Sequence, residues 1–435
     1  MKKFLIVLLS LGLIAAFGMT ASAADVKFGG SYYVVGFYDN NDRLQDTGKA
    51  YSRAAFYQRV RLEPVFQIAE GLTFTARMDA LEKQWGNTNW KSTTVVDGDT
   101  TSSRKNPGGT SKIQENFEFE RGYVTFKTAI GQFQIGYQAA GTWGTVFADS
   151  GTTRPRILYI TAAGPVTILA LYEKVFEADT STVTGYAGKA DADDDFQALA
   201  GIYGFKGGSA GLLWYHLRYA NTRVSGYRTT LNVLAPYVKA QFGPVYVESE
   251  ALYTFGKNVE MDSGGGDIDR SGWAAYLMAK TNLGPAYVGA QVGWSAGDDG
   301  SDPTKNKSGY GGGADWNPAL ILMNNDLNTW KAGGVNTANS GKANFLLYNV
   351  FGGFNPTPKL NLQLALTIAE ADKTTYVSKK MGTELDVTAT YKIYDNLSYM
   401  VGAGYLWTGD YFKGTNSANV IGNDYVLLNK LSLSF

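Results

Sequence analysis

Residues 54–80 alternate between apolar and polar side chains, which is the period-two pattern of β-strands. In 54–68 one face carries Phe56, Val60, Leu62 and Phe66, and the other carries Tyr57, Arg59, Arg61 and Glu63. After a short turn at 69–71 the pattern resumes, with Arg77 and Asp79 on the polar face. The stretch therefore predicts a β-hairpin with one apolar and one charged face.

The same pattern recurs along the chain from about Val26 to Phe435 and predicts about 18 strands, with 16 as the alternative count. Short turns alternate with long polar connections, and the longest of these are 87–114 and 298–343. An even number of antiparallel strands with charged residues in mid-strand is typical of a transmembrane β-barrel around a watery lumen. The predicted fold is all-β, a single antiparallel up-and-down barrel.

The last twelve residues, 424–435, alternate in the same way and place Tyr425, Leu431, Leu433 and Phe435 on one face. An open apolar strand at the end of a chain would invite aggregation. Pairing of this strand with the one that begins near Val26 would close the barrel and remove the free edge. We therefore expect the two ends of the barrel sequence to lie side by side.

Aromatic residues gather near the predicted strand ends. They are Trp85, Trp273, Trp294 and Trp407 at the ends next to long loops, and Phe66, Phe126, Phe205, Phe242, Phe354 and Phe435 at the ends next to short turns. Two such girdles mark the two interfaces of a membrane.

Residues 1–23 resemble a secretory signal. Lys2 and Lys3 precede an apolar run, and Ala21-Ser22-Ala23 is a small-residue cleavage site. The sequence thus predicts an exported chain in which 24–435 forms one barrel domain.

Composition excludes several kinds of site. The chain has no cysteine and one histidine, so a thiol enzyme and a multi-histidine metal centre are both excluded, and we expect no metal, no cofactor and no enzymatic activity. A lipase would need a serine beside His216, which we expect to face inward. Basic and acidic residues number 39 each, so no charge excess favours nucleic acid.

Charged residues on the predicted inner face are the candidates for controlling passage through the lumen. They are Arg59, Arg61, Glu63, Arg77, Asp79, Glu118, Glu120, Arg154, Arg156, His216 and Arg218. In the ninth strand we place His216 and Arg218 inward together with Trp214, and Tyr215, Leu217 and Tyr219 outward. Walls of opposite charge would create a transverse field that orients dipolar solutes.

An inward loop would narrow such a lumen, and two segments compete for this role. Residues 139–152 carry Asp149 but are short, whereas 298–343 are long, rich in Gly, Asn and Asp, and nearly free of strand pattern. Long loops of this kind are usually functional or disordered. The sequence leaves the choice between them open.

The leader, the alternating hairpins, the segments 121–137, 382–386 and 402–405, and the terminal aromatic strand resemble Gram-negative outer-membrane porins. The resemblance implies an outer-membrane location among lipid and lipopolysaccharide, a homotrimer, and passive diffusion of ions and small hydrophilic solutes. It also implies that Phe435, with Leu433, Leu431 and Tyr425, forms the signal for the barrel-assembly machinery. A substrate-selective or saccharide-export channel is the alternative function.

Overall fold

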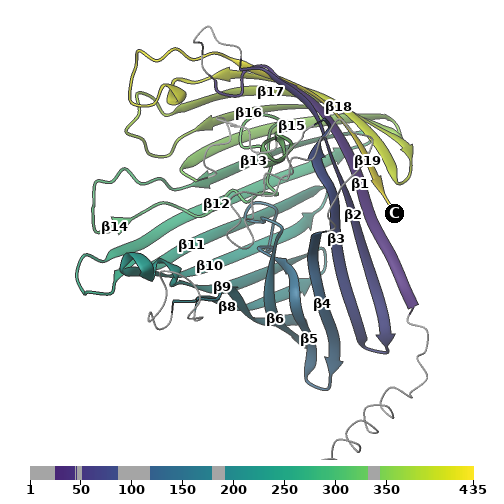
Figure 1. Ribbon diagram of the computed structural model, residues 1–435. Helices are drawn as coiled ribbons and strands as arrows, with labels where there is room; N and C mark the ends of the chain where they lie inside the picture. The colour runs from purple at the N-terminus through teal and green to yellow at the C-terminus, as the bar shows by residue number, and fades with distance from the viewer. Residues whose placement is uncertain (1–24, 45, 47–50, 87–117, 179–191, 332–342) are drawn as a thin grey trace, which may run out of the picture.

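The computed structural model describes residues 25–44, 46, 51–86, 118–178, 192–331 and 343–435. The expected leader at 1–23 and the loop at 87–114 lie outside the described residues. Within the described part, eighteen long antiparallel strands form one closed barrel, as the sequence predicted (Figure 1).

The barrel strands follow one another around the wall in chain order, apart from the two-residue β14. Their bounds are β1 (Asp25–Asp39), β2 (Arg53–Ala69), β3 (Leu72–Gln84), β4 (Glu118–Thr128), β5 (Gly131–Ala140), β6 (Thr152–Ala163), β7 (Val166–Phe176), β8 (Asp194–Phe205), β9 (Gly208–Tyr219), β10 (Tyr227–Phe242), β11 (Val245–Met261), β12 (Ile268–Leu283), β13 (Ala286–Ser295), β15 (Phe345–Thr357), β16 (Leu360–Glu370), β17 (Lys380–Tyr394), β18 (Leu397–Thr408) and β19 (Asp424–Ser434).

Short helices and one short strand interrupt the long loops. They are η1 (Asn221–Ser225), α2 (Asn325–Trp330), η3 (Asp410–Lys413) and β14 (Lys305–Asn306), which pairs in parallel with the start of β12. No helix in the described ranges is long and apolar enough to cross a membrane.

The two rims of the barrel differ because short and long connections alternate. The short turns fall at one rim, and several contain a glycine at positive φ, such as Gly71 at 74° and Gly164 at 60°. A residue with a side chain rarely adopts that conformation, so glycine permits the tight turn. The long loops gather at the other rim.

β19 closes the barrel against β1, with Ser434 opposite Ser31 and Val426 opposite Asp39. Phe435 extends the pairing, because its N–H and C=O both bond with the backbone of Gly30, at 3.1 and 2.8 Å. The predicted closure is confirmed. Phe435 is half-exposed and shares the outward face of its strand with Leu433, Leu431 and Tyr425.

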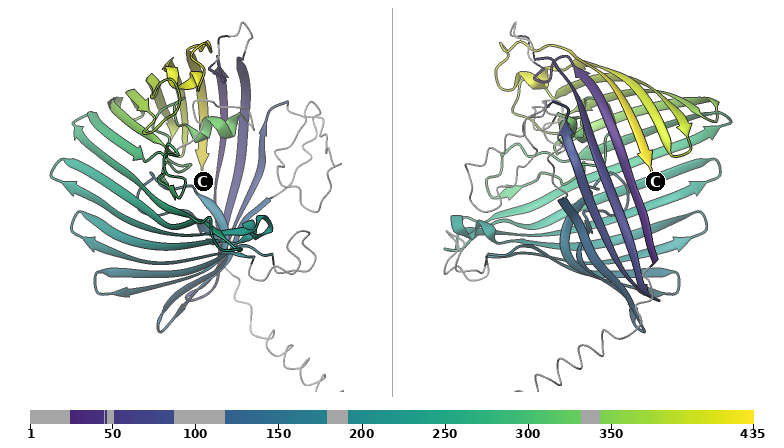
Figure 2. Two further views of the ribbon diagram at one scale, coloured as in Figure 1. Left: turned by 90° about the vertical axis from the view of Figure 1, so that its left-hand side faces the viewer. Right: turned by 45° about the vertical axis from the view of Figure 1, so that its right-hand side comes forward.

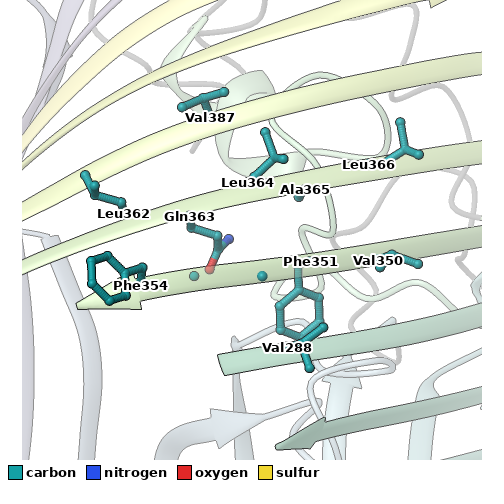
Figure 3. Close-up of a pocket in the computed structure, with 12 residues that line it drawn as sticks. Val288, Val350, Phe351, Phe354, Leu362, Gln363, Leu364, Ala365, Leu366 and Val387 are labelled. Atoms are coloured by element: carbon teal, nitrogen blue, oxygen red, sulfur yellow. The ribbon is translucent and has the colours of Figure 1, made fainter. Parts of the chain in front are cut away.

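The outward face of the wall is largely apolar. Figure 3 shows part of it, where Val350, Phe354, Leu364 and Val387 surround a shallow groove of about 700 Å³ above Gly352. Trp85, Trp273 and Trp407 stand half-exposed near the long-loop rim. At the short-turn rim Phe66 packs on Phe74, with ring centroids 6.0 Å apart. Aromatic residues therefore mark both rims, where the sequence placed them.

Candidate functional site

The loop at 141–151, between β5 and β6, folds into the barrel and reaches the wall at β10 to β12. The indole Nε1 of Trp143 donates to the carbonyl of Ala235 on β10 at 2.8 Å. The backbone N–H of Thr145 donates to Glu250 on β11 at 2.9 Å, and the Thr145 hydroxyl donates to the same carboxylate oxygen at 2.7 Å. The loop is therefore fixed at a distance from its own strands.

The described part of the loop between β13 and β15, residues 296–331, also enters the barrel, and Figure 2 shows α2 of this loop inside the ring of strands. Glu384 on β17 accepts the backbone N–H groups of Ile321 and Leu322, each at 2.7 Å. The neighbouring Asp386 accepts the N–H of Leu320 at 3.3 Å. Two buried carboxylates thus hold three consecutive residues of the loop against the wall.

Residues 330–331 of this loop reach the seam where β1 meets the last strand. Gln84 on β3 donates to the carbonyl of Trp330 at 2.8 Å. Lys331 forms an ion pair with Asp39 on β1, and neither side chain is accessible to solvent. The ammonium of Lys430 on β19 lies 5.4 Å from the ring of Trp330. Such buried partners are costly to separate, so the loop is held to the wall at residues 320–322 and again at 330–331.

The two inward loops also bind each other. Phe147 stacks on Tyr276 of β12 with ring centroids 5.2 Å apart, and its edge meets Trp316 of the second loop. The N–H of Gly313 donates to the carbonyl of Phe147 at 2.7 Å, and that of Asp315 to the carbonyl of Asp149 at 3.0 Å. The sequence left open which of the two segments narrows the lumen. In the structure both loops enter the lumen and narrow it together.

Charged residues line the inner wall of β2 to β4, and most are paired with each other. Arg61 binds Asp79 through Nε at 2.6 Å, and Arg59 meets Glu82 at 3.4 Å. Arg77 forms an ion pair with Glu63. Each ion pair connects β2 with β3. The pairs therefore stabilise the hairpin and also place charged groups at the lumen.

A β-bulge between β3 and β4 places Arg121 inward, a position that strict alternation assigns to the outer face. The register shifts between Arg77 and Met78, so that Arg77 lies opposite Arg121 while Asp79 lies opposite Glu118. Glu118 and Glu120 face inward, and Arg121 joins them. Arg121 has no ion-pair partner within the described ranges, and its Nε is buried without a hydrogen bond. Period-two counting could not reveal it, because a bulge adds one residue to the count.

Arg154 and Arg156 on β6 face inward and share one acid. Glu173 on β7 lies 3.2 Å from Arg154 and 3.1 Å from Arg156. The hydroxyl of Tyr215 on β9 donates to the same carboxylate at 2.5 Å. Glu173 is almost completely buried.

The predicted orientation of β9 is wrong. Leu213, Tyr215 and Leu217 face inward, whereas His216 and Arg218 lie on the outward face with Trp214. The prediction assumed that the more polar face always lines the lumen, but at β9 the inner wall is apolar. His216 Nδ1 lies 3.1 Å from the amide oxygen of Asn232, which also accepts from Trp214 Nε1. Arg218 lies opposite Asp195. Neither residue lines the lumen.

Asp149 lies in the first inward loop, where its Oδ1 accepts the N–H of Trp143 at 2.6 Å. Burial raises the pKa of this carboxyl to about 6, and the charge of Asp315 adds to the increase. The hydrogen bond from Trp143 and the charge of Lys239 act in the opposite direction. Asp149 is thus a group that titrates close to neutrality at the junction of the two loops.

Buried carboxylates that hold the loops were missed by the sequence analysis. Glu250, Glu384 and Asp386 accept backbone N–H groups of the inward loops, and Glu173 holds two arginines. A signal for them exists in the sequence, since Glu384 and Asp386, like Glu248 and Glu250, stand two residues apart in otherwise apolar strands. Acids at such spacing share one face of a strand.

No protein-family model and no curated protein matches the sequence. Solved structures do match. The outer membrane protein OpdK from Pseudomonas aeruginosa has a TM-score of 0.54 at 11% identity, covering 94% of this chain and 99% of that chain. The chain has the fold of an outer-membrane porin. A BenF-like porin from Pseudomonas fluorescens Pf-5 has a TM-score of 0.54 at 13% identity, with 94% and 99% coverage. OccAB4 from Acinetobacter baumannii has a TM-score of 0.51 at 12% identity, with 95% and 99% coverage. At these identities the porin fold is what is shared.

Proposed function

We propose that this chain forms an outer-membrane channel that passes small hydrophilic solutes selectively. The porin fold, the apolar outer face and the charged inner wall support a channel across a lipid layer. An open barrel of 16 to 18 strands would leave a wide aqueous passage. Here the two inward loops occupy part of that space, and the remaining passage determines which solutes pass.

The contact between Phe147 and Trp316 carries the proposal of selectivity. Their rings meet edge to face with centroids 5.1 Å apart, and both side chains are almost completely buried. The two loops are therefore packed like a protein core at this point, and the passage beside them has a defined shape. A defined constriction is what discriminates among solutes by size and charge.

General diffusion is the second candidate function, and the wall of β2 to β4 favours it. The pairs of Arg59 with Glu82 and of Arg77 with Glu63 remain partly exposed to the lumen, with 39% of the Glu63 side chain accessible. A hydrated wall with both signs of charge would let small polar solutes pass without binding them tightly.

The orientation of the single histidine bears on the lipase considered from the sequence. His216 lies on the outward face, so the expected inward orientation no longer counts against a lipase, but its Nδ1 lies 3.1 Å from the amide oxygen of Asn232 and not beside a serine of the described ranges. We place the channel in the outer membrane, and the trimer remains a prediction that native mass spectrometry tests.

Single-channel recording in planar bilayers tests the proposed function. A selective channel should show small conductance steps that one class of solute interrupts at low concentration. Large ohmic steps that no solute interrupts would favour general diffusion instead. Absence of conductance from correctly folded protein would contradict both functions.

A further inference from the structure

A cavity of about 370 Å³ lies against the inner wall of β6 to β11, beside the loop at 141–151. Its size is near the lower end of the range for small-molecule sites, about 300–1,000 Å³. Leucine, valine and alanine side chains form most of the lining, namely Leu158, Leu171, Leu213, Leu217, Val233 and Leu252, with Ala198, Ala200 and Ala235 between them. These residues point into a lumen whose other wall is charged.

An apolar inner wall is costly in a channel that holds only water. Leu158, Leu217 and Leu252 are each less than one-tenth exposed, whereas Leu171 and Leu213 keep part of their surface open to the cavity. A solute with an apolar body would displace water from this surface and gain free energy in proportion to the area that it covers. The wall thus favours solutes that carry a ring or a branched hydrocarbon group.

The charged groups at the cavity balance one another. Arg154 and Arg156 supply two positive charges, and Glu173 and, when it is ionised, Glu250 supply two negative charges. Glu173 binds both arginines, and Glu250 accepts two hydrogen bonds from Thr145. An ion that entered this cavity would lose its hydration. Because the charges in the cavity are already paired, none is free to neutralise the ion, and its binding is unfavourable.

Polar partners for an uncharged group are nevertheless available. Glu250 is almost completely buried, and its Oε1 accepts no hydrogen bond from the part of the chain that the structure describes. The loop side of the cavity is lined by Thr142, Ser150 and Thr152, whose hydroxyls both donate and accept. A neutral group with N–H or O–H donors could therefore be satisfied here.

We propose that this cavity binds electroneutral solutes that combine a compact apolar body with a hydrogen-bond donor. The inference rests on the proposed function in one respect, that such solutes reach the cavity by entering the lumen. It names their class, since net charge should weaken binding whichever sign it has.

Three probes of nearly the same shape test the proposal, namely benzamide, benzoate and benzamidinium. Isothermal titration of the full chain in detergent micelles measures their dissociation constants, with protein-free micelles as the blank. Benzamide should bind about tenfold more tightly than either ion, because the desolvation of a charged group makes the binding free energy of both ions less favourable. Tighter binding of benzoate or benzamidinium, or equal binding of all three, would overturn the proposal.

Ala200→Leu fills the cavity and should weaken benzamide binding about tenfold, because the ring loses its space. The matched control is Ala170→Leu on the outward face of β7, opposite Leu199, which should bind like the native chain. If Ala200→Leu does not fold, Leu213→Ala serves instead, and it should shift preference from benzamide towards the larger 2-naphthamide. Unchanged binding in a folded cavity variant would place the probe elsewhere and contradict the inference.

Titration in detergent does not depend on conduction. A chain that conducts ions but shows no preference for benzamide would overturn this inference and leave the proposed channel intact. A chain that binds benzamide as described but conducts nothing would overturn the proposed function alone.

Discussion

The ring of Phe147 meets the ring of Trp316 edge to face, with centroids 5.1 Å apart and planes at 78°. These residues belong to loops that start on β5 and on β13, far apart around the barrel wall. Phe147 also packs on Tyr276, and Trp316 on Phe345, so the contact connects both loops to the inner wall. Neither loop would have the same position without the other.

Replacing Phe147 by alanine should loosen both loops and raise single-channel conductance. Removing a buried aromatic side chain costs about 3–5 kcal/mol of packing free energy. The barrel wall does not depend on this contact, so assembly should remain normal. Val146→Ala, at a half-exposed neighbour, is the control and should leave conductance unchanged. Equal conductance of Phe147→Ala and the native channel would show that this contact does not limit the passage.

The loop junction should respond to pH through Asp149, whose pKa is raised to about 6. A carboxyl with a raised pKa favours the packed loop when it is protonated. Its contribution is complete below the ordinary aspartate range near pH 4 and is lost as pH rises through about 6. Current fluctuations should therefore increase between pH 5 and pH 7.5.

Asp149→Asn is the matched variant for this pH response, because its amide oxygen can still accept the N–H of Trp143. The current through Asp149→Asn channels should show few fluctuations at both pH 5 and pH 7.5. Asp315, Lys239 and Glu250 also surround the site, so a response that persists in Asp149→Asn would assign the titration to one of them.

Arg121 should influence ion selectivity more cleanly than the arginines identified from the sequence. Arg121→Gln removes a positive charge from the lumen without breaking an ion pair within the described ranges, so the reversal potential should shift towards cations while stability is retained. Arg61→Gln leaves the buried Asp79 without its partner and should cost about 3–5 kcal/mol of unfolding free energy. Arg218→Gln, on the outward face, should change the reversal potential least. A shift in Arg218→Gln equal to that in Arg121→Gln would contradict the assigned faces.

Glu384 should hold the second loop in place. Glu384→Ala removes the acceptor for the N–H groups of Ile321 and Leu322, and buried donors left unpaired cost about 1–3 kcal/mol each. Hydrogen exchange should then accelerate in 319–331 and stay unchanged in the strands. Val387→Ala, which points outward from the same strand, is the control. Continued protection of 319–331 in Glu384→Ala would mean that Asp386 and the aromatic contacts suffice.

The barrel could be predicted from the sequence because alternation is a local property. The apolar and the polar face of each hairpin can be identified from its own residues, as in 54–80. The number of strands follows from counting the segments that show this alternation. The closure of β1 by β19 also followed, since a free apolar edge needs a partner.

The lumen was harder to predict, because its contents depend on contacts between distant segments. The alternation of residues shows that β9 has two faces but not which face is inside the barrel. We assigned the more polar face, with His216, to the lumen, and this was wrong because the inner wall at β9 is apolar. The bulge that turns Arg121 inward changes the parity of a strand without any marked sequence signal. The packing of Phe147 on Trp316 joins loops separated by more than 160 residues, for which no periodic pattern exists.

Deleting Phe435 should impair barrel assembly rather than selectivity. The residue makes the last two backbone hydrogen bonds of the seam, both with Gly30, and its ring stands half-exposed at the short-turn rim. Its removal shortens the closing pair and, by resemblance to porins, removes the signal for the assembly machinery. We expect the heat-modifiable, folded fraction in isolated outer membranes to fall about tenfold, whereas Phe435→Tyr, which keeps the backbone and the aromatic ring, should assemble normally. Channels that do form from the deleted chain should keep the native reversal potential, because the charged wall of β2 to β4 is untouched. A normal folded fraction after deletion would show that the seam closes without its last residue.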